Sequence, residues 1–278
     1  MIKIIADTTS VLPLDLCEKL GIVLMPQLIV FGEKTFRDDK ELSTEQFLSM
    51  LKTSKEAPKT AAPPPELYQP VYKELINQND TVLVICPSSD VSGTYRSATV
   101  AAQDFPDASI HIIDTRLIAG GLASLILKTH QWIQEGHDID SILENIHLRS
   151  LKEKMYFTPE TLEYLARGGR IGNAEAILGG LLQIKPVLTM IDGKNEVQEK
   201  QRTQKRAISR MIELTLQDCP HSEDAQLCVV QSDAPEKAAT IAQKLSQATG
   251  IKNIPIYQQC ASIVTHVGPG VLSISYYR

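Results

Sequence analysis

Short aliphatic runs alternate with longer amphipathic stretches over the first 150 residues. The runs that predict buried strands cover residues 2–6, 81–85 and 109–113, and each is followed by a polar segment. The stretches that predict helices cover residues 93–105, 118–135 and 139–150. Strand, loop and helix repeated in this order are typical of parallel strands joined by right-handed crossovers. We therefore predict a mainly parallel sheet flanked by helices in this half of the chain.

The pattern is less regular between the first two of these strands. Residues 22–31 predict a strand pair or an extended segment, broken near Pro26. Ser43 and Gln46 show the capping-box pattern at the start of a helix. Residues 57–65 contain four prolines and predict a loop, because proline disfavours helix at its own position and at the one before it. A further helix is predicted from residue 65 to residue 77.

Beyond residue 150, hairpin signals and short strands replace the regular alternation. Asp192 and Gly193 lie between two strand-like runs and predict a hairpin, and Thr158-Pro159-Glu160 predicts the start of a helix. Asp233 is expected to cap the helix that begins near Pro235. The other predicted elements are strands at residues 155–158, 227–231, 254–258, 262–265 and 271–276, and helices at residues 174–182 and 202–216.

This change of pattern predicts two domains of the α/β class. The first, residues 1–150, has the mainly parallel sheet, and the second, residues 151–278, is α+β with a mixed or antiparallel sheet. No linker-like segment marks the boundary, which we place near residue 150 from the change of pattern alone.

Charge and composition narrow the class of protein. The 278 residues contain 28 Lys and Arg against 33 Asp and Glu, a net charge of −5, which argues against nucleic-acid binding. No apolar run approaches the roughly 20 residues of a membrane-spanning helix. The five cysteines are an odd number without CxxC spacing, so we expect neither a disulfide framework nor a zinc site. The first strand begins at residue 2, and we expect a cytoplasmic protein.

The familiar motifs for nucleotide, metal and hydrolytic chemistry do not occur in the sequence. The first strand is followed by Asp7-Thr8-Thr9-Ser10 in place of GxGxxG, and the chain contains no GxxxxGK[ST], HExxH or GxSxG. The six histidines are scattered. We therefore predict no nucleotide cofactor, no metal and no catalytic residues.

Two candidate binding segments lie in the first half. Residues 87–95 carry Ser92 and Thr94 between a predicted strand and a predicted helix, where open α/β sheets bind ligands and helix N-termini attract anions. A simple helix cap is an equally good interpretation of Ser92. Thr60 lies in the proline-rich loop, where a solvated hydroxyl is the ordinary expectation.

Two further candidate segments lie in the second half. Arg170 follows Gly168 and Gly169 and could bind a carboxylate or phosphate, although a helix end with a solvated arginine explains it comparably well. His266 follows a predicted strand and enters a loop of glycines and proline. Together these segments offer hydroxyls, a guanidinium and an imidazole, without a nucleophile–base pair. The set predicts binding of a small anion rather than its chemical conversion.

The same residues resemble the DegV family, bacterial fatty-acid-binding proteins that serve as the lipid-carrying subunit of fatty acid kinase. The matching segments cover residues 5–10, 88–98, 114–115, 161–172, 184–186 and 266–270, in the family's order. The resemblance implies a long-chain fatty acid in a tunnel between the two domains. It also implies that the fatty-acid carboxylate is bound by Thr60, Ser92, Arg170 and His266, with Thr9, Thr94 and Gly169 nearby.

The resemblance further implies a carrier that is not itself an enzyme and whose bound group is the fatty acid. A separate ATP-binding kinase subunit would convert the carboxylate to an acyl phosphate for phospholipid synthesis. Arg170 and His266 would supply positive charge at the head of the lipid, and the predicted helix at residues 174–182 could line its tail. This chain departs from the family at Ala61-Ala62, where Ser-Gln is common.

Two other functions stay open on the sequence alone. One is a stand-alone phosphotransferase or hydrolase acting on a small anion, which the polar loops could host but for which no nucleotide motif is present. The other is a regulator that binds only proteins, which would leave the candidate anion-binding residues unexplained. Acyl length, oligomeric state and the cognate kinase do not follow from the sequence.

Overall fold

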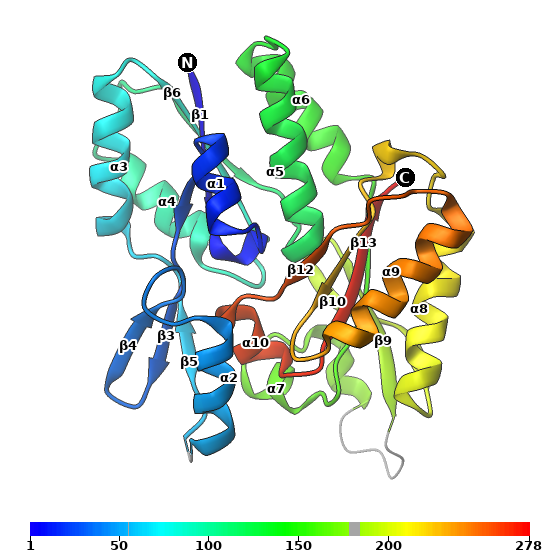
Figure 1. Ribbon diagram of the computed structural model, residues 1–278. Coiled ribbons are helices and arrows are strands. Elements are labelled where there is room, and N and C mark those ends of the chain that lie inside the picture. Colours follow the sequence, from blue (N-terminus) through cyan, green and yellow to red (C-terminus); the bar gives the residue numbers. More distant parts are fainter. Residues whose placement is uncertain (55, 178–183) are drawn as a thin grey trace.

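The computed structural model describes residues 1–54, 56–177 and 184–278, which form two α/β halves around a shared buried helix (Figure 1). The first half contains a four-stranded parallel sheet in the order β2-β1-β6-β7. Its strands are β1 (Ile2–Asp7), β2 (Val23–Met25), β6 (Thr81–Cys86) and β7 (Ile110–Asp114). Its helices are α1 (Leu14–Leu20), α3 (Pro65–Asn77), α4 (Thr94–Ala102), α5 (Ala119–Gln134) and α6 (Ile139–Ser150), and a short 3-10 helix η1 covers Thr8–Ser10. The predicted parallel sheet is confirmed.

Both faces of the parallel sheet are buried, which explains the uninterrupted apolar runs of its central strands. Successive side chains of a strand point to opposite faces. Ile5 and Val84 therefore pack toward α3 and α4, whereas Ile4 and Leu83 pack toward α5. All four side chains are almost completely buried.

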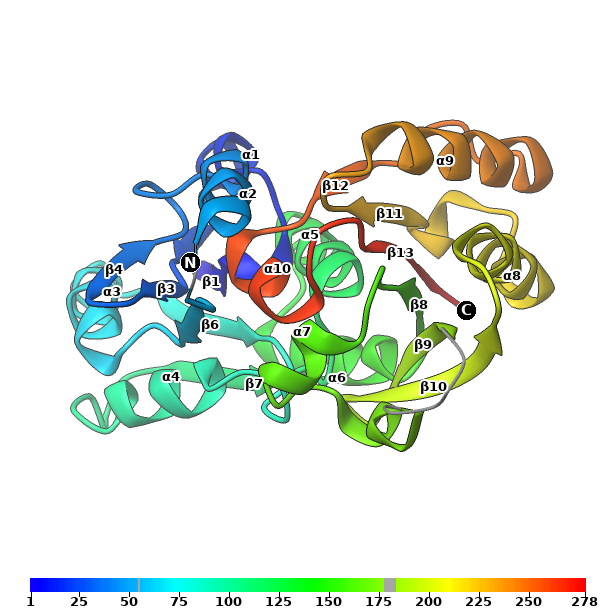
Figure 2. The same cartoon turned by 90° about the horizontal axis from the view of Figure 1, so that it is seen from below.

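The second half is built on a six-stranded mixed sheet in the order β10-β9-β8-β13-β11-β12, antiparallel except for the β11–β12 pair. Helices α8 and α9 cover one face, and α5 of the first half covers the other (Figure 2). The strands are β8 (Glu153–Thr158), β9 (Lys185–Ile191), β10 (Lys194–Gln201), β11 (Cys228–Gln231), β12 (Ile256–Gln258) and β13 (Leu272–Tyr277). The helices are α7 (Glu163–Arg167), α8 (Gln204–Asp218), α9 (Pro235–Thr249) and α10 (Ala261–Val267), with 3-10 turns η2 (Gly172–Ile177) and η3 (Glu223–Ala225).

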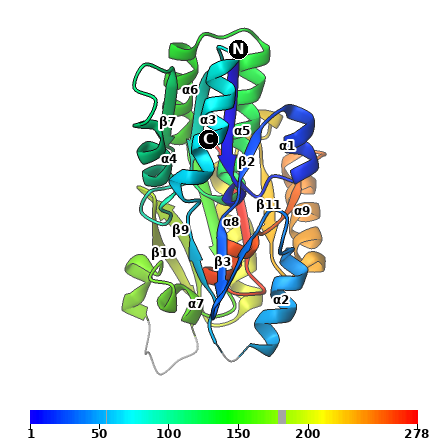
Figure 3. The ribbon, with the colours of Figure 1, turned by 90° about the vertical axis from the view of Figure 1, so that its left-hand side faces the viewer.

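A small antiparallel sheet of the first half holds a helix of the second half. Its strands β4 (Lys34–Arg37), β3 (Leu28–Phe31) and β5 (Lys59–Ala61) lie with helix α2 (Thr44–Thr53) at the end of the molecule far from the N-terminus (Figure 3). Ile29 and Phe47 form a buried cluster with Ala261 and Val264 of α10. This cluster joins segments more than 200 residues apart in the chain.

The prediction of a strand at residues 262–265 is wrong, because this segment lies within helix α10. Every residue from Ala261 to Thr265 is buried, so the apolar run has no exposed face from which helical periodicity could be recognised. Packing against the small sheet, η1 and α7 surrounds the helix. Tertiary contacts therefore determine its conformation.

Smaller corrections concern the ends of elements. Residues 57–65 were expected to be a loop but include β5, which pairs with β3. The helix expected to start at Thr158 begins at Glu163, because β8 continues to Thr158. Asp233 does not cap α9, and its carboxylate instead lies 3.5 Å from the Lys52 amine.

Other local predictions are confirmed. The capping box of α2 is formed by Ser43 and Gln46, and the hairpin between β9 and β10 turns at Asp192 and Gly193. Residues 178–182 of one predicted helix lie outside the described residues. The domain boundary near residue 150 stays a prediction, although β8 and all later strands belong to the mixed sheet. In the described ranges, no helix has the length and apolar character needed to cross a membrane.

The carboxyl group of Glu153 is buried at the contact between β8 and α5. It occupies the space that a side chain at Gly121 would fill, so the glycine makes room for it. Burial raises the pKa of Glu153 from 4.5 to about 8, because a charged carboxylate is disfavoured away from water. The folded protein therefore retains a proton that the unfolded chain releases.

We expect this carboxyl to make stability fall as the pH rises from about 5 to 8. In that window the folded state binds more protons than the unfolded state, so the free energy of unfolding declines with pH. Glu153→Gln should remove that decline, which amounts to about 1.4 kcal/mol per pH unit at most. Urea unfolding at several pH values measures it, with the exposed Glu144→Gln as the matched control. An unchanged pH profile in Glu153→Gln would contradict the assignment.

Candidate ligand-binding site

A narrow apolar cavity of about 70 Å³ lies between the two halves. Strands β8 and β9 contribute Met155, Phe157 and Met190, whereas Val91 and Ile118 come from the first half. The remaining wall comes from α5, α7, α10, β10 and β13 and from the loops between them. Both halves are therefore needed to form it.

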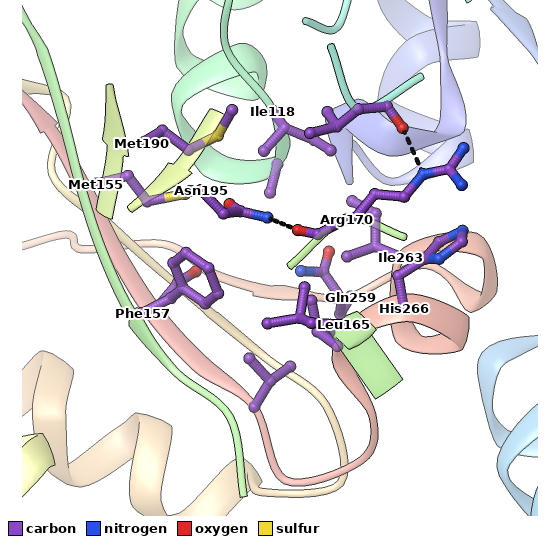
Figure 4. A pocket seen from close by; sticks show the side chains of 15 residues that line it. Ile118, Met155, Phe157, Leu165, Arg170, Met190, Asn195, Gln259, Ile263 and His266 are labelled. Atoms are coloured by element: carbon purple, nitrogen blue, oxygen red, sulfur yellow. Dashed lines mark hydrogen bonds between the residues drawn. The ribbon is translucent and has the colours of Figure 1, made fainter. Parts of the chain in front are cut away.

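The two ends of the cavity differ in chemistry. Figure 4 shows Arg170 and His266 on one side and Met155, Met190 and Phe157 on the opposite side. One end thus offers a guanidinium and an imidazole, and the other is mostly carbon and sulfur, with the Ser273 hydroxyl beside Phe157. This polarity suits a ligand with a charged head and an apolar tail.

Arg170 is held in place by contacts with both halves. Its Nε donates a hydrogen bond to the Val91 carbonyl at 3.2 Å, and its Nη1 donates to the Gly168 carbonyl at 2.6 Å. The side-chain amide of Asn195, which is buried, donates to the Arg170 carbonyl at 2.7 Å. The side chain and the backbone of Arg170 are therefore both oriented before any ligand arrives (Figure 4).

His266 and Thr60 meet across the boundary between the halves. Nε2 of His266, in the last turn of α10, lies 2.7 Å from the Thr60 hydroxyl on β5. Burial, and secondarily the charge of Arg170, lowers the pKa of His266 to about 4. The imidazole is therefore neutral at pH 7. His266 therefore does not add the positive charge expected at this end, because a buried imidazolium beside a guanidinium is unfavourable.

Ser92 lies at the end of a buried hydrogen-bond network. The Thr94 hydroxyl donates to the Asp7 carboxylate at 2.6 Å and lies 3.0 Å from the Ser92 hydroxyl. Thr94 has a single hydroxyl proton, so Ser92 is the donor in the second contact. The Gln27 amide donates to both Asp7 and Thr94. Burial raises the pKa of Asp7, and the surrounding hydrogen bonds partly oppose this effect.

The loop that carries Ser92 lies against the strand that carries Thr60. A side chain at Gly93 would be 3.3 Å from the Ala62 side chain, which places the loop beside the end of β5. Ser92 also accepts a hydrogen bond from the Thr94 backbone N–H at 3.3 Å, so it contacts the start of α4 as a cap would. Its position serves local structure, and neither Ser92 nor Thr60 is among the described residues that line the cavity.

Thr9, Thr94 and Gly169, which the resemblance places near the carboxylate, differ in how close they lie to Ser92. Thr94 is in contact with Ser92, whereas Thr9 is one step further away, donating to the Asp7 carboxylate. Gly169 is exposed and faces away from its neighbours. The neighbouring Gly168 is the glycine that contacts His266, because a side chain there would overlap the ring atom Nδ1.

Several wall residues were not identified from the sequence. Met155 and Phe157 are two residues apart on β8, so their side chains point to the same face of the sheet. The strand pattern of the sequence could have identified this pair. Gln259 and Ser273 have no such signal. Both are buried, and Oε1 of Gln259 and Oγ of Ser273 have no hydrogen-bond partner in the described part of the chain. In the same ranges, no three His, Cys, Asp or Glu side chains are arranged to hold a metal ion.

Comparison with known proteins identifies the family. The DegV family model matches residues 1–278. The Protein DegV of Bacillus subtilis is 32% identical over 279 residues, covering 99% of this chain and 98% of that protein. A DegV family protein from Thermus thermophilus, solved for its fatty acid binding, superimposes with a TM-score of 0.92 at 29% identity and 99% coverage of both chains.

A third protein shares the fold at lower identity. The Fatty Acid Kinase (Fak) B3 protein of Streptococcus pneumoniae, solved with linoleic acid, has a TM-score of 0.85 and 21% identity, covering 100% of this chain and 99% of that one. At this identity the likeness shows the fold alone. The match over all 278 residues shows that this chain belongs to the DegV family.

Proposed function

We propose that this protein binds a long-chain fatty acid between its two halves and presents the carboxylate to a separate kinase. The observation that carries the proposal is the polarity of the cavity, with Arg170 and His266 at one end and a mainly apolar wall at the other. His266 is in turn paired with Thr60. The fatty acid binding of the Thermus thermophilus relative supports the same class of ligand. We place this carrier in the cytoplasm.

The apolar wall supplies most of the affinity in this proposal. Each buried CH₂ group contributes about 0.8 kcal/mol, so an acyl chain of ordinary length outweighs the cost of immobilising the ligand. The described wall contains one cationic side chain, Arg170, which offsets the cost of removing a carboxylate from water. Hydroxyl groups would complete its hydrogen bonds.

Thr60 is better prepared than Ser92 to donate to that carboxylate. Nδ1 of His266 is buried without a hydrogen-bond partner among the described residues, so a proton there would be a donor without an acceptor. We therefore assign the proton to Nε2, which donates to Thr60 and leaves the Thr60 proton for the ligand. The Ser92 proton is directed at Thr94 and must turn to reach a carboxylate.

The proposed kinase step takes place on the bound carboxylate. A carboxylate oxygen forms a bond to the γ-phosphorus of ATP, and the bond from that phosphorus to the bridging oxygen breaks, giving an acyl phosphate and ADP. ATP is supplied by the kinase in this proposal. The resemblance in the segments around Ser92, Gly168 and His266 supports the assignment of a lipid-presenting, non-catalytic subunit. The acyl phosphate would then serve phospholipid synthesis.

The proposal predicts that protein purified from cells carries a lipid. Native mass spectrometry should show an added mass equal to one fatty acid, which denaturation releases. The same protein, stripped of lipid, should take up added palmitate with one-to-one stoichiometry. Protein that is consistently lipid-free and fails to bind added fatty acids would refute the proposal.

The hydroxyls at the head are tested by removing them singly. Thr60→Val and Ser92→Ala should each weaken palmitate binding about tenfold, because a hydrogen bond to a charged group contributes about 1.5–3 kcal/mol. Thr35→Val, an exposed position on the same small sheet, is the matched control and should bind normally. Fluorescent fatty-acid displacement measures the affinity, and unaltered binding by both variants would remove these hydroxyls from the site.

The contact between Gly168 and His266 is tested by a double-mutant cycle. Gly168→Ala should displace the imidazole and separate it from Thr60, costing about 1–3 kcal/mol of stability as overpacking does. The backbone of Gly168 has a helical conformation that alanine also adopts, so the cost is steric. In a His266→Ala background the same substitution should cost little. Equal unfolding costs in both backgrounds would show that the contact does not matter.

A further inference from the structure

A second pocket adjoins the cavity and is lined by both members of the Thr60–His266 pair. We call it the outer pocket because it also takes in exposed side chains. Arg170 and His266 line both spaces, so these two side chains form part of the partition between them. The outer pocket is more polar than the cavity and also takes in Lys59 and Arg167. Arg170 is therefore a side chain that a carboxylate in the cavity and a group in the outer pocket could share.

The outer pocket is lined by more positive charges than are needed to bind one carboxylate. Lys59, Arg167 and Arg170 line it, and its described wall contains no Asp or Glu, although the whole chain has a net charge of −5. Lys59 and Arg167 are exposed, and neither forms an ion pair in the described ranges. The Arg167 guanidinium instead lies 5.6 Å from the centre of the Tyr164 ring. These cations are therefore available to an anion.

We propose that the outer pocket binds the phosphoryl group of the acyl phosphate, so that the chain has a site for the product as well as for the fatty acid. This inference rests on the proposed function. Phosphorylation attaches a group with about two negative charges to the carboxylate oxygen, just outside the partition. A guanidinium can bind two phosphate oxygens at once, and an ammonium adds a point charge. The product head is then bound by three cations where the substrate head is bound by one.

A stable analogue of the product tests the inference directly. The probe is a long-chain β-ketophosphonate, in which a CH₂ group replaces the anhydride oxygen and which cannot be hydrolysed. Palmitate serves as the substrate ligand, and both affinities are measured by displacement of a fluorescent fatty acid. The variants are Lys59→Met, Arg167→Met and the double variant, with the exposed Lys34→Met of the same small sheet as the control.

The wild-type protein should bind the phosphonate more tightly than palmitate. Each single variant should lose about tenfold in phosphonate affinity, and palmitate affinity should stay within about twofold. Both substituted side chains are exposed, so the variants should fold, and circular dichroism verifies this. Lys34→Met should behave like the wild type with both ligands.

Three other outcomes would overturn the inference. Equal phosphonate affinity in the wild type and the double variant would show that these cations do not contact the head. Binding of inorganic phosphate to palmitate-loaded protein, without any gain for the phosphonate, would make the pocket an anion site unrelated to the product. If the variants lowered only the rate of phosphorylation by the kinase and left phosphonate affinity unchanged, the outer pocket would be a docking surface for that enzyme. Failure of wild-type protein to bind palmitate would instead refute the proposed function.

Discussion

Helix α5 is the element on which the two halves depend, because it packs against the sheets of both. It contacts β1 in the parallel sheet and β8, β11 and β13 in the mixed sheet. Leu122, Leu125 and Ile126 are completely buried in the shared core. A side chain at Gly120 would overlap Cys228 and Val230 of β11, so this glycine permits the close approach of helix and sheet. The Tyr277 hydroxyl reinforces the contact by donating to the carbonyl of the next residue, Gly121, at 2.6 Å.

The cavity lies at the N-terminal end of α5, and the position of this end determines where the cavity forms. Ile118 and Ala119, at its N-terminus, belong to the cavity wall, whereas the body of the helix fills the space between the sheets. Beyond this end of α5, the small sheet and α10 close the gap between the halves. The same packing brings Thr60 and His266 together although 206 residues separate them. Stability and site geometry therefore depend on one set of contacts.

The sequence predicted those parts of the structure that are encoded locally. The parallel sheet, the capping box at Ser43 and the turn at Asp192 follow from nearby residues and are observed. The sequence wrongly predicts a strand at residues 262–265, because the residues that pack around this helix come from distant segments. The sequence pattern points to the segments of Ser92, Arg170 and His266 as anion-binding candidates. Thr60 alone looks like an ordinary loop threonine, and its role follows only from the family resemblance. The roles of Gly168 and Lys59 depend on contacts and pockets across the halves, for which the local pattern has no signal.

The polar end of the cavity has limited capacity to hold a carboxylate in the proposed function. The described cavity wall offers one guanidinium, and two N–H groups of Arg170 already donate to backbone carbonyls. Affinity then comes mainly from the apolar wall, which does not discriminate between an acid and its acyl phosphate. In the proposed product site, discrimination between substrate and product would fall to Lys59 and Arg167, which line the outer pocket and not the cavity.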